Sequence, residues 1–170
     1  LGLPYPGGPE ISRLASTARK NPSFVSTIKL PRPMMDSDNY DFSFSGIKTA
    51  VRNIVEAHQP LSDDMKLQIA LEFENSCAEV LVAKTMRAIE EFGAESILVG
   101  GGVSANTHIR ESLAQAIKDY GYNTKLLIPP PELATDNALM IAFADYFRAQ
   151  KKEFATADSI KATGNLKLHS

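Results

Sequence analysis

The stretch Leu98-Val99-Gly100-Gly101-Gly102-Val103-Ser104-Ala105-Asn106 decides the fold that we expect for this chain. A short apolar run breaks into three glycines, and a helical pattern opens at Asn106. The stretch Pro129-Pro130-Pro131-Glu132-Leu133-Ala134-Thr135-Asp136-Asn137-Ala138 follows a second apolar run in the same way. Each loop places backbone N–H groups and a polar side chain at a helix N-terminus, where anions are bound well. Two such loops in one α/β unit indicate a nucleotide site.

Helical and strand-like patterns alternate around these two loops. Helices are predicted over 11–20, 46–57, 63–91, 106–120 and 136–150, and strands over 24–30, 40–46, 96–99 and 125–128. Gly93 and Gly121 are expected to follow the ends of two of these helices. From residue 63 onward the order is helix, strand, helix, strand, helix, which predicts a parallel or mixed sheet covered by helices.

The composition is that of a soluble globular domain. Of the 170 residues, 44% are hydrophobic and 22% are charged, and the formal net charge is −2. The charge provides no overall positive field toward nucleic acid, although it leaves a local basic patch open. No apolar run approaches the roughly 20 residues that a membrane span needs. Cys77 is the single cysteine, which excludes an internal disulfide, suits a reducing compartment and predicts a core residue. Because the chain starts at Leu1 rather than Met, we expect it to be part of a longer protein.

Two readings stay open for each motif when it is taken alone. The triple glycine is either a tight turn capped by Asn106 or a loop that a phosphate or sugar approaches closely. It is not a Walker A loop, because no Gly-Lys-Ser/Thr follows, and it lacks the third spaced glycine of a dinucleotide fingerprint. Asp136 is either the cap of the following helix or an acidic ligand for a metal.

Other residue types are expected to have ordinary structural roles. Gly7-Gly8-Pro9 predicts a turn first and a binding loop second, and Ser45 is a candidate N-cap. The three histidines show no ligand-like spacing and are expected at the surface: His58, His108 and His169. No Ser/His/Asp set and no His-Glu-x-x-His pattern support a protease.

Four motifs together resemble one family. They are Tyr5-Pro6-Gly7-Gly8-Pro9, Phe42-Ser43-Phe44-Ser45-Gly46-Ile47-Lys48-Thr49-Ala50, Gly101-Gly102-Val103-Ser104-Ala105-Asn106, and Pro129-Pro130-Pro131-Glu132 with Thr135-Asp136-Asn137-Ala138 and Met140-Ile141-Ala142. In this order they are similar to the TsaD family of bacterial tRNA threonylcarbamoyladenosine transferases. That family is related to a subunit of the archaeal and eukaryotic KEOPS complex.

The resemblance implies a fold and a reaction. The fold is α/β, the second lobe of an actin-, hexokinase- and Hsp70-like two-lobed architecture whose first lobe is missing here. Residues 1–150 correspond to the C-terminal half, mostly the second lobe, and 151–170 to a polar, loosely held tail. The family transfers a threonylcarbamoyl group from threonylcarbamoyl-adenylate to the adenosine beside the anticodon of tRNAs that read codons beginning with A.

The resemblance also assigns residues. It places substrate binding at Gly8 and Asn106, with Gly101 and Gly102 in the glycine loop, and metal binding at Asp136. The metal is one ion, usually iron (Fe²⁺), held by two histidines and an aspartate. Those histidines belong to the part before this chain, so the chain alone is expected to be inactive. Where many relatives have an acidic residue near the ribose, this chain has Ser12, with Glu10 two residues earlier. No residue is an evident general base.

The expected partners are tRNA, threonylcarbamoyl-adenylate and the TsaB and TsaE proteins, in the cytoplasm and without a membrane. The alternative is a non-catalytic partner or scaffold of the same fold, similar to TsaB, and Asp136 and the intact glycine loop argue against it. Half of a sugar or acetate kinase is a third reading, which the motif from Phe42 to Thr49 does not suit.

Overall fold

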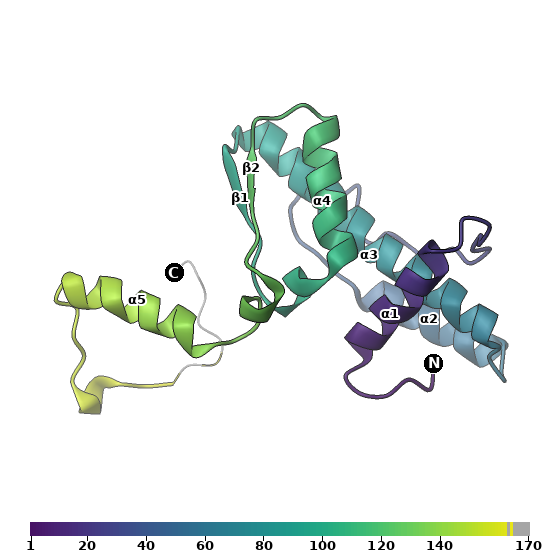
Figure 1. The fold of residues 1–170 in the computed structure, drawn as a ribbon, viewed down its shortest axis with the longest axis horizontal. Coiled ribbons are helices and arrows are strands. Elements are labelled where there is room, and N and C mark those ends of the chain that lie inside the picture. The colour runs from purple at the N-terminus through teal and green to yellow at the C-terminus, as the bar shows by residue number, and fades with distance from the viewer. Residues whose placement is uncertain (163, 165–170) are drawn as a thin grey trace.

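The computed structural model describes residues 1–162 and 164, which form five α-helices and two short strands (Figure 1). Three short 3₁₀ turns lie at Gly102–Ala105, Pro131–Leu133 and Ala157–Ser159. The elements are α1 (Gly7–Arg19), α2 (Ser45–Ala57), α3 (Asp63–Phe92), β1 (Ser96–Leu98), α4 (Thr107–Asp119), β2 (Lys125–Leu127) and α5 (Ala138–Gln150).

Helix α3 is the axis on which the other elements pack. Its N-cap is Ser62, whose side chain accepts a hydrogen bond from the Met65 N–H at 3.1 Å, and its end follows the prediction, since Gly93 ends the helix with φ +59°. Figure 1 shows α1 and α2 against one half of α3, and α4 with the sheet against the other half. Ala15 of α1 and Ile47 of α2 are completely buried.

The two strands pair in parallel, as the alternation of elements predicts. Ser96 pairs with Lys125 and Leu98 with Leu127. One face of this sheet packs on α3 and α4 through two apolar clusters. Their buried members are Ala78, Ile109 and Leu113 in one cluster, and Met86, Ile89 and Ile117 in the other. The opposite face is open, because Leu98 is 78% exposed and Leu127 51% exposed. The α/β order is therefore confirmed, with a two-stranded sheet in the described residues.

The strand predicted over 24–30 is wrong. This segment has no regular secondary structure, and two of its backbone donors pair with side chains of α3 instead of another strand. The Thr27 N–H donates to Gln68 Oε1 at 2.9 Å, and the Leu30 N–H donates to Glu72 Oε1 at 3.2 Å. A weakly alternating pattern cannot distinguish a strand from an extended segment that lies along a helix.

The strand predicted over 40–46 is wrong as well. The segment is irregular, and it is held by the buried Lys84 of α3, whose ammonium donates to Ser37 Oγ at 2.8 Å and to the carbonyl oxygens of Asn39 and Asp41 at 3.1 and 2.6 Å. A lysine that satisfies backbone carbonyls takes the place of a partner strand. Ser45 is the first residue of α2 and makes no capping hydrogen bond, so it is not the N-cap that we predicted.

Two helix starts also differ from the prediction. α1 begins at Gly7, so Gly7-Gly8-Pro9 forms its first turn rather than a turn before it, which proline tolerates because first-turn N–H groups lack intrahelical partners. α5 begins at Ala138, and its cap is Asn137, whose Oδ1 accepts from the Met140 N–H at 3.0 Å. Asp136 therefore does not cap the helix.

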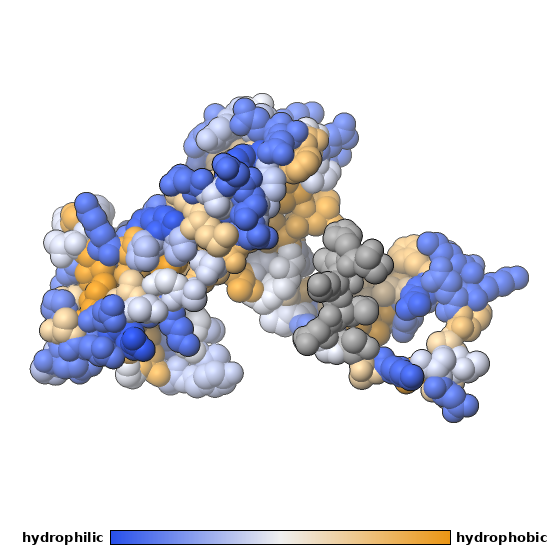
Figure 2. All heavy atoms as spheres, turned by 180° about the vertical axis from the view of Figure 1, so that it is seen from behind, coloured by the Kyte–Doolittle hydropathy of each residue, from blue (hydrophilic) through white to orange (hydrophobic). Residues whose placement is uncertain are grey.

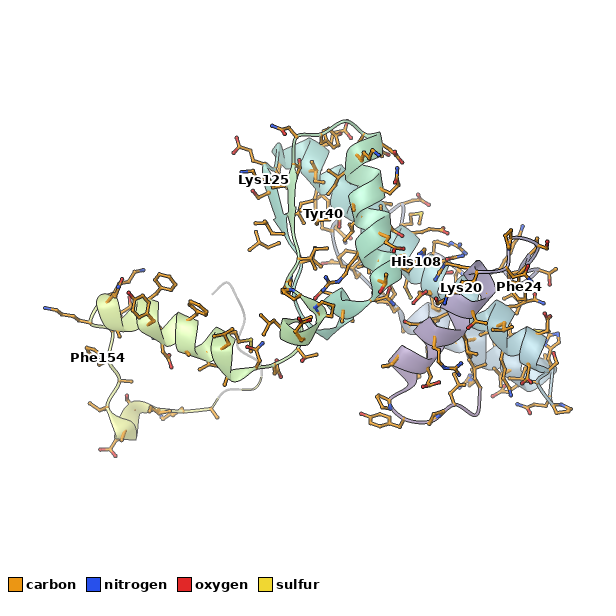
Figure 3. The ribbon with its side chains drawn as sticks, in the orientation of Figure 1. Lys20, Phe24, Tyr40, His108, Lys125 and Phe154 are labelled. Atoms are coloured by element: carbon orange, nitrogen blue, oxygen red, sulfur yellow. The ribbon has the colours of Figure 1, made fainter. Side chains whose placement is uncertain are left out.

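Helix α5 stands apart from α1–α4 (Figure 1), and all of its residues are exposed. Its exposed side chains include large apolar ones: Leu139, Met140, Ile141, Phe143, Tyr146 and Phe147. The space-filling view shows apolar surface in this part and over the helices at the other end (Figure 2). The tail is exposed as far as it is described, and Phe154 within it extends away from the rest (Figure 3). The described residues therefore leave the apolar side chains of α5 uncovered.

Candidate functional site

The two loops that follow the parallel strands meet at the carboxyl end of the sheet. The loop after β1 carries the three glycines, and the loop after β2 carries the three prolines. Arg110 of α4 joins them, because its guanidinium donates to the Ser104 carbonyl oxygen and, at 2.6 Å, to the Pro129 carbonyl oxygen. In open parallel sheets, ligands bind outside the carboxyl ends of the strands. The structure thus brings both predicted motifs to the expected edge.

The glycine loop depends on glycine at Gly101, where φ is +83°, a conformation that other residues rarely adopt. At Gly102, an added Cβ would lie 3.8 Å from the Thr135 side chain, which confirms that the two loops touch. Both glycines are exposed. A ligand can therefore approach the backbone here closely.

Asn106 caps α4 and also reaches across to α1 and α3. Its Oδ1 accepts from the Ile109 N–H at 2.9 Å, which is the N-cap bond. Its Nδ2 donates to Ser12 Oγ at 2.9 Å and to Glu74 Oε1 at 2.6 Å. The capping reading of Asn106 is confirmed, and the amide also joins three helices.

Glu74 is the centre of this junction. It lies in the middle of α3, is 5% exposed, and accepts hydrogen bonds from Arg19, Asn106 and the Ser12 hydroxyl, the last at 2.7 Å. Burial by itself raises the pKa of this carboxyl, but the hydrogen bonds from Arg19, Ser12 and Asn106 outweigh burial and hold the pKa below its usual value. Glu74 is therefore an ionised, almost fully enclosed carboxylate.

Gly8 lies one helical turn before Ser12 on α1 and faces open space. A Cβ built on Gly8 would meet no atom of the described residues within 4 Å, outside its immediate neighbours. The nearby polar groups already have partners: Ser12 is bonded to Glu74, and Glu10 forms an ion pair with Arg13 at 2.9 Å. Through Ser12 and Asn106, the Gly8 motif is tied to the glycine loop.

Asp136 is exposed in the loop before α5. Because Asn137 caps α5, the Asp136 carboxylate does not have the capping role that was one of its two predicted roles. Within residues 1–162 and 164, no three His, Cys, Asp or Glu side chains are grouped so that they could hold a metal ion. The described residues therefore bring no set of three such side chains together around Asp136.

The cysteine and the histidines give no alternative reactive group. Burial, together with the Glu74 charge, raises the pKa of Cys77 to about 11, so its thiol is protonated at neutral pH. His58 is exposed as predicted, but His108 is half-buried, which corrects its predicted surface position. Burial, followed by the charge of Arg19, lowers the pKa of His108, which lies on α4 beside α3 and near the end of α1 that leads to Lys20 (Figure 3). His169 lies outside the described residues.

Sequence reasoning missed Glu74, Arg19 and Arg110. A carboxylate in the middle of a helix with apolar neighbours on the same face is a signal for a buried partner, and Glu74 has Ala70, Leu71, Cys77 and Ala78 three and four residues away. The identity of its partner is not readable from the sequence, because Arg19 is 55 residues away along the chain.

The fold and the site define an α/β unit with a candidate ligand-binding edge where two strand-to-helix loops meet. The chain belongs to the TsaD family: the family model described as TsaD, tRNA N6-adenosine threonylcarbamoyltransferase, matches residues 1–143.

Curated relatives carry the same description. A tRNA N6-adenosine threonylcarbamoyltransferase of Thermosipho africanus is 42% identical over 169 residues, which cover 99% of this chain and 48% of that protein. Proteins of that name from Aromatoleum aromaticum and Enterococcus faecalis are 44% and 42% identical, covering 88% and 92% of this chain and 41% and 43% of their own lengths. The chain thus spans less than half the length of these relatives.

In the part of the chain that the structure describes, no helix is both long and apolar enough to cross a membrane.

Proposed function

We propose that this chain holds the nucleotide part of threonylcarbamoyl-adenylate in a protein that transfers the threonylcarbamoyl group to tRNA. The transfer target is the adenosine beside the anticodon. Membership of the TsaD family and the names of its relatives support the reaction. Because the chain spans less than half of those relatives, the proposal assigns the activity to the complete gene product.

The hydrogen bond between Asn106 and Ser12 carries this proposal. It joins two predicted binding motifs that are 94 residues apart, one on α1 with Gly8 and one on the loop after β1. A purely structural cap would need only the Ile109 N–H. The bond to Ser12 also ties the first turn of α1, which carries Gly8, to the loop after β1.

Each residue at this edge has a proposed role. Gly8, Gly101 and Gly102 allow the nucleotide to lie against the backbone, since a side chain at these positions would occupy exposed space. Asn106 orients the nucleotide by a hydrogen bond. Fixing one reactant in this way lowers the entropic barrier when the adenosine amine approaches the carbonyl carbon. The amine nitrogen bonds to the carbonyl carbon, the bond from that carbon to the phosphate oxygen breaks, AMP leaves, and the nitrogen gives up one proton to solvent.

We propose Asp136 as one ligand of the family's metal, expected to be iron. A carboxylate with imidazoles is a suitable donor set for such an ion. The described residues supply one carboxylate and no complete set of ligands, so the other ligands would come from the rest of the gene product.

The exposed apolar side of α5 and the open sheet face support a further proposal about the whole protein. Leu98, Leu127 and the aromatic residues of α5 form apolar surface that monomeric proteins normally cover. We assign them to contacts with the remainder of the gene product, as in a two-lobed fold of which this chain is mostly the second lobe. The TsaB and TsaE proteins and tRNA are the proposed partners of that complete protein, in the cytoplasm.

The test uses adenosine monophosphate (AMP) as a probe and the complete gene product. Asn106→Ala should weaken AMP binding and lower the thermal midpoint, while Asn106→Ser, which can still cap but cannot replace the bonds of Nδ2 to Ser12 and Glu74, should restore part of the midpoint and none of the affinity. Losing one ligand hydrogen bond should cost on the order of 1 kcal/mol, and losing the cap about the same in stability. If Asn106→Ser restores both quantities, Asn106 is only a cap. A protein that binds no AMP is not a nucleotide-binding transferase and behaves like a scaffold.

A further inference from the structure

The buried Glu74 lies on α3, away from both loops, yet it contacts the one side chain that we assign to nucleotide orientation. Its Oε1 accepts from Asn106 Nδ2 at 2.6 Å and from Ser12 Oγ at 2.7 Å, while its second oxygen is paired with Arg19. We infer that Glu74 is a positioning residue whose carboxylate fixes which way the Asn106 amide faces, so that Asn106 meets a nucleotide as a hydrogen-bond acceptor. The inference rests on the proposed function.

The direction of the amide follows from the chemistry of its partners. A carboxylate only accepts hydrogen bonds, so the Asn106 atom that faces Glu74 must be the nitrogen. The backbone N–H of Ile109 only donates, so the atom that faces it must be the oxygen. Both ends of the amide are therefore specified independently, and they agree.

Oδ1 is the Asn106 atom with an identified free bonding position. Nδ2 already donates to two acceptors, Ser12 Oγ and Glu74 Oε1. Oδ1 uses one lone pair on the Ile109 N–H and retains the second. Asn106 is half-buried, so part of it remains accessible. A nucleotide group that bonds to it must be a donor, which for AMP means the exocyclic amine or a ribose hydroxyl.

Arg19 holds Glu74 in its ionised form, which only accepts hydrogen bonds. Arg19 also donates to Asn75 Oδ1 at 2.6 Å, so its guanidinium is fixed on two neighbouring residues of α3. The ion pair keeps Glu74 ionised in spite of its burial. In Glu74→Gln, the side-chain oxygen should turn to Arg19, which leaves an NH₂ group facing Asn106. Two donors would then meet, and the Asn106 amide would have to turn or move.

Glu72 is a matched control for this substitution. It lies two residues earlier on α3, is 9% exposed, and is also paired with an arginine, Arg32. Its contacts are with the segment before α2, through the Leu30 N–H, and not with Asn106. Glu72→Gln therefore reproduces the loss of a buried ion pair without changing the partner of Asn106.

The first experiment titrates the complete gene product with AMP. We expect Glu74→Gln to weaken AMP binding by about three- to tenfold, the effect of one misplaced hydrogen bond, and Glu72→Gln to leave AMP affinity unchanged although both lower the thermal midpoint. The Asn106 side-chain NH₂ signal, observed with ¹⁵N-labelled asparagine, should shift in Glu74→Gln and stay in place in Glu72→Gln. Wild-type AMP affinity in Glu74→Gln overturns the inference and leaves the proposed function standing.

A second measurement uses the wild-type protein and Asn106→Ala, so it does not depend on whether a Glu74 variant folds. Purine riboside 5′-monophosphate, 2′-deoxy-AMP and 3′-deoxy-AMP each remove one donor group from AMP, and we expect one of them to bind the wild-type protein several-fold more weakly than AMP. That difference should disappear in Asn106→Ala. If no analogue binds more weakly, or if the difference persists in Asn106→Ala, Asn106 is not an acceptor for the nucleotide. If wild-type protein binds no AMP, the proposed function fails and this inference fails with it.

Discussion

Lys84→Met tests whether one buried ammonium organises the segment that precedes α2. The Lys84 side chain is 1% exposed, and its three acceptors are the Ser37 hydroxyl and the carbonyl oxygens of Asn39 and Asp41. Its ammonium also lies 5.5 Å from the centroid of the Phe42 ring. Methionine keeps an apolar stem of similar length and removes every one of these interactions.

The magnitude follows from two opposing effects. Hydrogen bonds to a charged group contribute about 1.5–3 kcal/mol each, and a buried carbonyl left without a donor costs about 1–3 kcal/mol. Burying an ammonium costs several kcal/mol, which the methionine recovers. The Ser37 hydroxyl also bonds to the Met34 carbonyl, and the Asn39 carbonyl also accepts from Arg87 at 2.6 Å, so the Asp41 carbonyl is the acceptor left without its donor. We therefore expect the free energy of unfolding to fall by about 1–3 kcal/mol.

Urea denaturation of the complete gene product measures this loss as a lower midpoint at unchanged slope. Lys66→Met is the control, because Lys66 lies on the same helix and pairs with the exposed Asp63 at 3.2 Å, so its midpoint should hardly move. Equal midpoints for the two variants would refute the reasoning, since Lys84 would then contribute no more than a surface lysine.

Three other predictions address the site and its surroundings. Asp136→Ala in the complete gene product should lower metal content and transfer activity together and leave the thermal midpoint nearly unchanged, because Asn137 caps α5; metal analysis showing full occupancy in this variant would exclude Asp136 as a ligand. The 170-residue chain alone should not transfer threonylcarbamoyl groups to tRNA, since the described residues hold no complete metal site, and turnover without added protein would contradict this. Cys77, with its pKa raised to about 11, should react slowly with iodoacetamide at pH 7 and about tenfold faster for each pH unit up to about pH 11; a rate that levels off below pH 9 would disprove the shift.

The predicted elements that held are those with local chemical signals. Ser62 and Asn106 cap their helices with their own side chains, and Gly93 ends α3 in the left-handed conformation. The two segments predicted as strands and found irregular had only alternation in their favour. Their conformation depends on Gln68, Glu72 and Lys84. These side chains lie on α3 and form hydrogen bonds with the backbones of the two segments.

The sequence by itself determined which residues line the candidate edge, because Gly101, Asn106 and the loop before α5 sit where a strand changes to a helix. It also determined family membership, since four motifs stand in order along the chain. Only the tertiary structure decided what these residues can do. The direction of the Asn106 amide depends on Glu74, 32 residues away, and on Ser12, 94 residues away. Hydrogen bonds are short-ranged and directional, so such contacts exist only after α1 and α4 have packed on α3.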